Sequence, residues 1–476
     1  MRKTKIICTL GPSTDDPAVL RELMLSGMDV ARINMSHQDH DAHRARIDRV
    51  RALREELRLP IAILIDTKGP EIRLGTFPEK VTLKAGDTFT LTTVPAEGTA
   101  ERASISFAGL PGDVDKGSHI LIDDGLIDLI VEKTTDTDIV CTVLNGGTVS
   151  SNKGINVPGA ALSMPFMSER DKADIAFACE MEADFIAASF TRRASDVLQV
   201  RQELEQHQNH SIRIIAKIEN AEGVDNIDDI LKVSDGIMVA RGDMGVEISL
   251  EEIPSIQKTL IHKGYNAGLQ VITATQMLDS MIRNPRPTRA EVTDVANAVY
   301  DGTDAVMLSG ETAQGKYPVE ALQMMVHIVE NTEKHLDYDL ILKQAEEHRM
   351  KSVSSALAHA TVTTAGNLGA KCIIAPSMSG ATSRVVSKFK PKTEIIGVSP
   401  NERTLRRMQI YWGVRPLKSI QVYTTEDICN SAIELICAKQ LAETGDVVVL
   451  TAGIPSPHVA GAGTGFSNMM RIAVVE

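Results

Sequence analysis

The sequence predicts an α/β protein, namely a (β/α)8 TIM barrel with an inserted β-barrel lid domain and a C-terminal α/β domain. Eight short apolar runs alternate with amphipathic helical segments, which indicates a parallel sheet covered by helices, and eight such units favour a closed barrel. The segment after the third run changes to short strands and turns, and a second α/β series begins near the C-terminus. We therefore expect a catalytic barrel at residues 1–70 and 167–343, the lid at 71–166 and the C-terminal domain at 344–476.

The eight apolar runs are the predicted barrel strands. They are KIICTLG (5–11), VARINMS (30–36), IAILIDT (61–67), ADFIAAS (183–189), IRIIAKIE (212–219), GIMVARG (236–242), QVITATQ (270–276) and AVMLSGE (305–311). Segments such as DPAVLRELMLSG and SDVLQVRQELEQH lie between them and have the spacing of amphipathic helices.

The two other predicted domains differ from the barrel in pattern. Stretches such as KVTLKAGDTFTLTT and SHILIDDGLIDLIVEK, with Gly-Asp, Asp-Gly and Asn-Gly turns, predict an all-β insertion, which at this place usually covers a barrel's active site. After a predicted helix at about 319–337, the runs KCIIAP (371–376), EIIGVS (394–399), VVVLTAG (447–453) and RIAVVE (471–476) predict the strands of the last domain.

Composition narrows the class of protein. The net charge of −13 disfavours nonspecific binding to nucleic acid or anionic membranes, so we expect neither partner. The first apolar run is too short for a signal sequence or a membrane span, and we expect a cytoplasmic location. The six cysteines are scattered without a C-x-x-C pair, which indicates reduced thiols.

Polar side chains gather where the predicted barrel strands end, which is the end that carries barrel active sites. Lys217 and Glu219 lie two residues apart, so they share one face of their strand while Ile218 takes the other. An isolated pair of this kind would indicate a structural ion pair. Other strand ends carry Arg32, Asn34, Ser36, Asp66, Thr67, Arg241, Asp243, Thr273, Thr275 and Ser309. Because a structural network would scatter over both barrel ends, the joint pattern favours a functional site.

The chemistry of this set favours phosphoryl transfer. Glu219 and Asp243 suit a divalent cation such as Mg²⁺, and Lys217, Arg32 and Arg73 suit phosphate or carboxylate anions. A monovalent cation could be held by the oxygen ligands Asn34, Ser36, Asp66 and Thr67. No Ser-His-Asp set, nucleophilic Cys or Walker A loop is evident, so an array that stabilises charge is favoured over covalent attack.

Two other motifs have simpler interpretations. His37, His40 and His43 recur at a spacing of three, and on a helix they would rotate away from one another, which disfavours a zinc site. Thr288 and Glu291 form an apparent capping box at a helix start.

Several long motifs, taken together and in order, resemble those of the pyruvate kinase family. They are RINMSH, DTKGPEIR, NKGINVPG, AKIEN, MVARGDMG, TATQMLDSM, NPRPTRAE and MLSGETAQGKYP, and the resemblance runs from about residue 2 to residue 475. The family joins a barrel, a β-rich lid and a regulatory α/β domain, which agrees with the organisation above.

The resemblance implies transfer of a phosphoryl group from phosphoenolpyruvate to ADP, giving ATP and enolpyruvate, which is protonated to pyruvate. Matched by position, Lys217 would stabilise the moving phosphoryl group, Glu219 and Asp243 would hold Mg²⁺ or Mn²⁺, and Thr275, or water ordered by it, lies where enolpyruvate is thought to be protonated. Glu71 stands where potassium-dependent members carry Glu. The other implied roles are K⁺ binding by Asn34, Ser36, Asp66 and Thr67, substrate contacts by Arg32, Lys217, Gly242, Asp243, Thr275 and Ser309, and nucleotide contacts by Arg73, Lys153, Asn34 and His37.

The family also implies a homotetramer and allosteric regulation by a phosphorylated small molecule. SMSGATSR (377–384) follows a predicted strand and opens a helix, so it predicts either an anion site or a capping loop without a ligand. The candidate effector contacts are Ser377, Ser379, Gly380 and Thr382. Ala381 stands where many members activated by fructose 1,6-bisphosphate carry Lys or Arg, which leaves another sugar phosphate or a nucleotide monophosphate open. Gln38 also departs from the family, which often has Gly there.

Two alternative functions would explain some of the same residues. A barrel lyase or aldolase acting on an enolate of pyruvate explains Glu219 and Asp243 but neither the lid nor Lys153 and Arg73. A catalytically silent metabolite-binding regulator conflicts with the presence of every matched reactive position. The sequence therefore favours the kinase.

Overall fold

The described residues form a closed eight-stranded parallel barrel and three further sheets of seven, two and five strands. The computed structural model describes residues 2–347, 351–453 and 467–476. The barrel strands run in the order β1-β17-β16-β15-β14-β13-β3-β2. Each of the eight predicted runs contains one of them: β1 Lys5–Thr9, β2 Val30–Asn34, β3 Ala62–Asp66, β13 Phe185–Ala188, β14 Arg213–Ile218, β15 Gly236–Ala240, β16 Gln270–Ala274 and β17 Ala305–Leu308. The predicted TIM barrel is confirmed.

Alternation along these strands explains the continuous apolar runs. In β1, Ile6 and Cys8 belong to the core between strands and helices, whereas Ile7 belongs to a second core that includes the barrel-strand side chains of Val30 and Leu64. Both faces of each strand are therefore buried, as expected for a parallel barrel.

Helices surround the barrel and follow its strands. Their bounds are η1 Pro12–Thr14, α1 Pro17–Ser26, α2 His40–Leu57, α4 Glu169–Glu180, α5 Ala194–Gln206, α6 Ala221–Asp225, α7 Ile227–Val233, α8 Arg241–Glu247, α9 Ile253–Ala267, η2 Asp279–Ile282, α10 Arg289–Tyr300, α11 Gly310–Ala313 and α12 Pro318–Glu333. The capping box predicted for Thr288 and Glu291 is present at the start of α10. Since the hydroxyl and the carboxylate each accept from the other residue's backbone, they fix where this helix begins.

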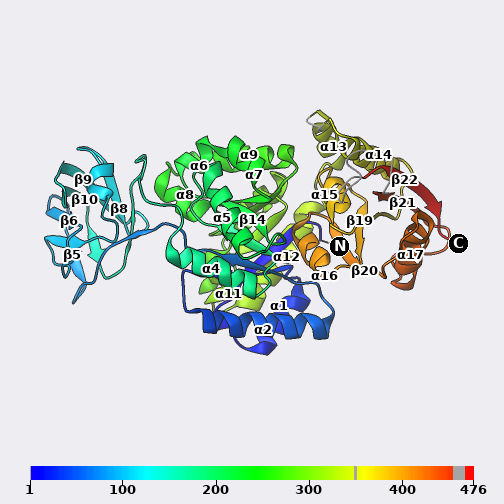
Figure 1. The fold of residues 1–476 in the computed structure, drawn as a ribbon, viewed down its shortest axis with the longest axis horizontal. Helices are drawn as coiled ribbons and strands as arrows, with labels where there is room; N and C mark the ends of the chain where they lie inside the picture. The colour runs from blue at the N-terminus through cyan, green and yellow to red at the C-terminus, as the bar shows by residue number, and fades with distance from the viewer. Residues whose placement is uncertain (1, 348–350, 454–466) are drawn as a thin grey trace.

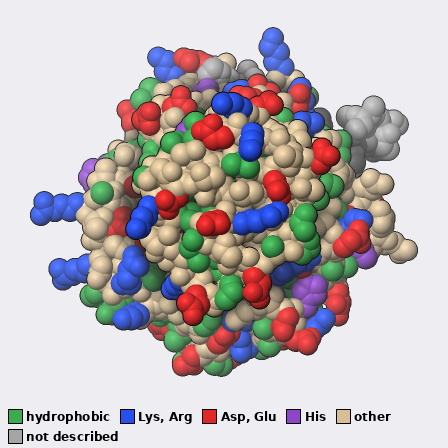
Figure 2. All heavy atoms as spheres, turned by 90° about the vertical axis from the view of Figure 1, so that its left-hand side faces the viewer, with side chains coloured by type: hydrophobic (Ala, Val, Ile, Leu, Met, Phe, Trp, Pro, Cys, Tyr) green, Lys and Arg blue, Asp and Glu red, His purple; other side chains and the backbone are tan. Residues whose placement is uncertain are grey.

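The inserted segment forms a separate β structure at one end of the molecule (Figure 1). Its strands are β4 Ile72–Arg73, β5 Val81–Leu83, β6 Thr88–Thr92, β7 Arg102–Ser104, β8 His119–Ile122, β9 Ile127–Thr134, β10 Asp138–Asn145, β11 Gly147–Val149 and β12 Gly154–Asn156, with a short helix α3 Leu110–Asp113. A seven-stranded sheet has the order β4-β12-β8-β9-β10-β6-β7, and β5 pairs with β11. Figure 2 views this end and shows acidic and basic side chains interspersed over it.

The C-terminal segment forms a five-stranded sheet of order β20-β19-β18-β21-β22. Its elements are α13 Tyr338–Glu347, α14 Val353–Asn367, β18 Cys372–Pro376, α15 Ala381–Ser387, β19 Glu394–Ser399, α16 Glu402–Arg407, η3 Met408–Ile410, β20 Val414–Lys418, α17 Thr425–Ala438, β21 Val447–Ala452 and β22 Met469–Val474. Strand β20 was not predicted, because VRPLK contains a proline and two cations. Proline is tolerated there since β20 is an edge strand.

The barrel, the two sheets of the insertion and the C-terminal sheet each lie within one of the three predicted segments, and the domain boundaries themselves stay predictions. Within the described residues, no helix is both long and apolar enough to cross a membrane.

Candidate active site

Asp66 is the centre of a buried charged cluster at the carboxyl ends of the strands. It is the last residue of β3, and its Oδ2 accepts a hydrogen bond from Arg32 Nε of β2 at 2.6 Å. Its Oδ1 lies 3.1 Å from Lys217 Nζ of β14 and accepts from Ser189 Oγ at 3.0 Å. Burial by itself raises the pKa of Asp66. The positive charges of Arg32 and Lys217 lower it by more, so the net pKa falls below its usual range. Asp66 therefore holds both cations as an ionised carboxylate.

Lys217 is held from three sides. Its Nζ donates to Ser189 Oγ at 2.8 Å and lies 2.9 Å from Glu219 Oε1. Burial by itself lowers the pKa of Lys217, but Asp66 and Glu219 outweigh it and raise the pKa above the ordinary lysine value. Lys217 is thus a fixed ammonium ion at the barrel end.

The direct contact of Lys217 with Glu219 adds to the sequence prediction. Strand alternation placed both on one face, and Ile218 indeed packs in the outer core. The family resemblance assigns Lys217 to the phosphoryl group and Glu219 to the metal, so it relates the two side chains through these ligands. In this structure the two side chains form an ion pair with each other. The reason is that alternate residues of a strand project to the same side, within reach of one another when one side chain is long.

Glu219 keeps one oxygen without a hydrogen bond. Its Oε2 accepts from the backbone N–H of Phe190 at 2.6 Å, while the buried Oε1 has the ion pair but no hydrogen-bond partner among the described residues. Burial raises the pKa of Glu219 to about 7, although Lys217 opposes this rise. Phe190 has φ 54°, in the left-handed region. An oxygen of this kind is suited to a cation.

Asp243 and Gly242 lie in the first turn of α8, directly after β15. The N–H of Gly242 donates to Thr275 Oγ1 at 2.7 Å, and the same hydroxyl donates to Ala274 O at 2.7 Å. The side chain of Arg241 links this turn to its neighbours. Its Nη1 lies 2.6 Å from Asp294 Oδ1 of α10, and its Nη2 donates to Thr275 O at 2.8 Å. The hydroxyl of Thr275 thus fixes the backbone of Gly242.

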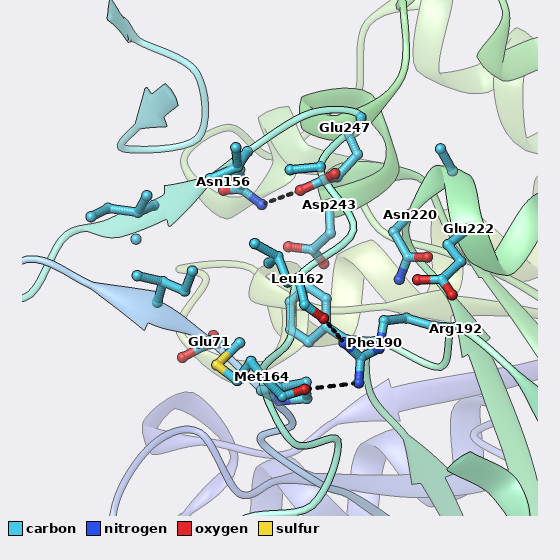
Figure 3. A pocket seen from close by; sticks show the side chains of 18 of the residues that line it. Glu71, Asn156, Leu162, Met164, Phe190, Arg192, Asn220, Glu222, Asp243 and Glu247 are labelled. Carbon is cyan, nitrogen blue, oxygen red and sulfur yellow. Dashed lines mark hydrogen bonds between the residues drawn. The ribbon is translucent and has the colours of Figure 1, made fainter. Parts of the chain in front are cut away.

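A cavity of about 520 Å³ lies between the inserted sheet and the barrel. Arg73 and Lys153 of the insertion and Asp243 of the barrel line it, whereas Glu219 and Lys217 are not among its lining residues. Figure 3 shows Glu247 projecting toward Asn156, whose Nδ2 donates to Glu247 Oε1 at 3.1 Å.

The basic groups of the cavity already have acidic partners. Lys153 Nζ lies 2.7 Å from Asp123 Oδ1, and Arg73 Nη2 lies 2.8 Å from Glu71 Oε2. Both side chains stay about one-third exposed, each at 36 %. They can therefore turn toward an anion at small cost.

The predicted potassium ligands come from two neighbouring strand ends. Asn34 of β2 pairs in register with Asp66 of β3, and Thr67 follows directly. Asn34 Oδ1 accepts from the N–H of Ser36 at 3.1 Å, and Thr67 Oγ1 donates to Ala187 O at 3.3 Å. The four residues are adjacent, although both oxygens of Asp66 already bind cations or hydroxyls.

Two further predicted contacts are Ser309 and His37, and the N–H of His37 donates to Asn34 O at 3.5 Å. Ser309 Oγ is buried without a hydrogen-bond partner in the described chain, and its N–H donates to Glu311 Oε2 at 2.7 Å. His37 is exposed and precedes α2. The expectation that the three histidines share one helix is therefore wrong, because only His40 and His43 lie on α2. His40 Nε2 instead lies 2.7 Å from Asp174 Oδ1, and His43 Nε2 lies 2.7 Å from His37 O.

Gln38 shows why family members often carry Gly at its position. Its φ is 65°, in the left-handed region that glycine adopts without strain. Its side chain accepts a hydrogen bond from Arg46, which offsets part of that cost.

The candidate effector loop binds its own backbone. Ser377 Oγ accepts from Gly380 N at 3.0 Å, and Ser379 Oγ accepts from Ala381 N at 3.4 Å. The hydroxyl of Thr382 is buried and accepts from Ser467 Oγ at 2.9 Å. These contacts are those of a capping loop, and an anion would compete with them.

Sequence reasoning missed Ser189 and Phe190. Ser189 ends the fourth predicted strand run, so its place among polar strand ends was visible in the sequence. The contact of the Phe190 backbone with Glu219 was not visible, because it depends on a backbone angle.

Known proteins match most or all of this chain in sequence. The family described as pyruvate kinase, barrel domain, matches residues 1–322, and the pyruvate kinase alpha/beta domain matches residues 355–473. A pyruvate kinase of Clostridium acetobutylicum is 46 % identical with complete coverage of both chains, and one of Geobacillus stearothermophilus is 48 % identical over 100 % of this chain and 81 % of its own.

A solved structure agrees with the sequence comparison. The crystal structure of a pyruvate kinase from Cryptosporidium parvum superposes with a TM-score of 0.94 at 40 % identity, covering 100 % of this chain and 96 % of that one. The chain therefore belongs to the pyruvate kinase family and is an enzyme of that kind.

Proposed function

We propose that the charged cluster transfers a phosphoryl group from phosphoenolpyruvate to ADP, giving ATP and pyruvate. The observation that carries this proposal is the ammonium of Lys217, buried between Asp66, Glu219 and Ser189 at the end of the barrel that faces the cavity. A transferring phosphoryl group spreads negative charge over its oxygens, and a cation fixed in advance stabilises it with little reorganisation.

Glu219 and Asp243 are proposed to hold Mg²⁺ or Mn²⁺. Oε1 of Glu219 has the ion pair with Lys217 but no hydrogen-bond partner among the described residues, so it can also accept a metal ion, and Asp243 lies near enough for its charge to raise the pKa of Glu219. Two carboxylates do not fill the coordination sphere of a metal ion. Mg²⁺ commonly completes its coordination with water and substrate oxygens. When bound, the ion supplies positive charge to phosphoryl oxygens.

The proposed K⁺ ligands are Asn34, Ser36, Asp66 and Thr67. Their support is the register of Asn34 with Asp66 and the neutral oxygens around a single carboxylate. Glu71 keeps its carboxylate on Arg73, so it contributes charge nearby without being free itself.

Substrate roles follow from position. Arg32 is proposed to contact phosphoenolpyruvate beside Lys217, and Gly242, Asp243, Thr275 and Ser309 are proposed contacts on the strands that follow. Arg73, Lys153, Asn34 and His37 are the proposed nucleotide contacts. Because the hydroxyl hydrogen of Thr275 already points to Ala274 O, an ordered water is the better candidate to protonate enolpyruvate.

Regulation and assembly are proposed on the family resemblance. They comprise a homotetramer in the cytoplasm and a phosphorylated effector at Ser377, Ser379, Gly380 and Thr382.

The test of function is pyruvate formation from phosphoenolpyruvate and ADP. We expect turnover with Mg²⁺ and acceleration by K⁺, and none when the divalent ion is removed. Absence of product under these conditions would refute the proposal. Turnover without nucleotide would instead support a lyase or aldolase.

A further inference from the structure

A second contact region lies at the opposite end of the barrel from the active site. Helix α16 of the C-terminal segment packs against the loops that precede β13 and β14 (Figure 1). Arg406 Nε donates to both oxygens of Asp184, at 2.8 and 3.1 Å. Asp184 is fully buried and immediately precedes β13, so α16 is fastened to the barrel beside the N-terminal ends of its strands.

An open cavity of about 600 Å³ adjoins this contact. The barrel contributes Cys179, Asn209 and Ser211 to its wall, and α16 contributes Arg403 and Arg407. The two arginines face the barrel side of the cavity, because both donate to Ser211, Arg403 to Oγ and Arg407 to the backbone carbonyl.

The cavity contains more positive charge than its surroundings balance. Arg407 is 9 % exposed, and its Nε is buried without a hydrogen-bond partner. Within the described ranges, no carboxylate oxygen lies within 4.0 Å of its guanidinium. Among the described residues, the acidic partner of Arg403 is the exposed Glu182, which also lines the cavity and whose Oε1 lies 3.9 Å from Nη2.

The charges of the neighbouring arginines act on Arg407 as well. Burial is the main cause that lowers the pKa of Arg407, and the positive charges of Arg213 and Arg403 lower it further, while Tyr411 and the charge of Asp184 oppose this. A buried guanidinium among like charges is costly unless an anion accompanies it. Paired guanidinium groups match the oxygens of phosphate in geometry as well as charge.

We propose that this cavity binds a small dianion that carries a phosphate group, held by Arg403 and Arg407. The ligand would lie between the barrel and α16, and its negative charge would balance part of the positive charge of Arg403 and Arg407. The site is distinct from the charged cluster at the other barrel end and from the loop at 377–384.

The cavity is linked to that loop through one side chain. Thr404, which also lines the cavity, donates its hydroxyl hydrogen to Met378 O at 2.7 Å. A ligand on α16 would therefore stabilise the same helix that joins the loop to the barrel. Such a site can bias how the C-terminal sheet is held against the barrel.

Cys179 offers a readout that is independent of catalysis. It lines the cavity and is partly exposed, whereas Cys437, also partly exposed, does not line it. We would measure alkylation of each thiol by iodoacetamide in the full chain, by mass spectrometry, as inorganic phosphate is titrated. At phosphate ten times above its Kd, we expect alkylation of Cys179 to slow about tenfold, with Cys437 unchanged.

Two variants assign the protection to this site. Arg407→Gln and Arg403→Gln should each remove most of the protection, while Arg471→Gln, a surface arginine paired with Glu426, should keep it. Since Arg407 is buried and its variant can fail to fold, the side chain of Arg403, which is 27 % exposed, gives the deciding variant. If phosphate leaves the alkylation of Cys179 unchanged, or protects it equally in Arg403→Gln, the proposal is wrong. Pyruvate formation is measured separately, so either proposal can fail alone.

Discussion

Lys217 and Glu219 form an ion pair within one strand end, with 2.9 Å between Nζ and Oε1, and both side chains are almost wholly buried. The pair has a second carboxylate, Asp66, on its other side. Charges packed in this way are costly unless each is matched, so a change at one position should alter the others.

Lys217→Met should abolish phosphoryl transfer, with kcat falling by about a thousandfold or more, because the fixed cation beside the phosphoryl group is lost. It should also lower the free energy of unfolding by about 3 kcal/mol, since Asp66 and Glu219 lose their shared partner. Pyruvate formation and urea unfolding measure the two effects. Mn²⁺ binding, followed by electron paramagnetic resonance, should persist at alkaline pH because Glu219 and Asp243 remain. Near-normal turnover would remove Lys217 from the reaction.

Metal affinity should depend on pH through Glu219. Because its pKa is raised to about 7, the carboxyl is protonated below that pH, and the proton competes with the metal. Mn²⁺ affinity should therefore fall as the pH decreases, approaching about tenfold per pH unit well below the pKa. In Glu219→Gln the affinity should be low throughout, and this part of the pH dependence should disappear. The same slope in wild type and variant would assign the titration to another group.

Ser189→Ala should slow turnover without unfolding the protein. The hydroxyl accepts from Lys217, and its single hydrogen can donate to either Asp66 Oδ1 or Thr67 O, so its loss leaves the ammonium less well placed. We expect kcat to fall about tenfold, corresponding to the loss of about 1.4 kcal/mol. Steady-state kinetics measure the effect. Ser234→Ala is the matched control, because this buried hydroxyl bonds Ile230 O at the other end of the barrel. Equal losses in both variants would indicate general destabilisation.

Asn156→Ala should weaken the contact between the inserted sheet and the barrel. The side chain of Asn156 is the hydrogen-bond partner of Glu247 on α8, the helix that carries Asp243. Losing about 1 kcal/mol of this contact should raise the KM for ADP about fivefold while the free energy of unfolding changes little. Asn145→Ala serves as the control, since Asn145 bonds Leu126 O within the insertion. An unchanged KM in Asn156→Ala would show that this bond does not hold the lid.

Local patterns predicted much of the fold and the site. Each barrel strand falls within a predicted run because strands buried on both faces are written as continuous apolar segments. Alternation also predicted that Lys217 and Glu219 share a face. Strand β20 escaped prediction, because Pro416, Arg415 and Lys418 give it no apolar run and only its edge position in the sheet makes it a strand.

By itself, the sequence determined which residues end the barrel strands, because the order of strands and the two-residue period are local properties of the chain. Only the tertiary structure decided which of those groups touch: Asp66 with both Arg32 and Lys217, Asn156 with Glu247, and Arg407 with Ser211. These contacts join residues far apart in the chain, and their distances depend on strand register, loop angles such as that of Phe190, and the packing of α16 against the barrel. A local sequence pattern predicts none of these quantities.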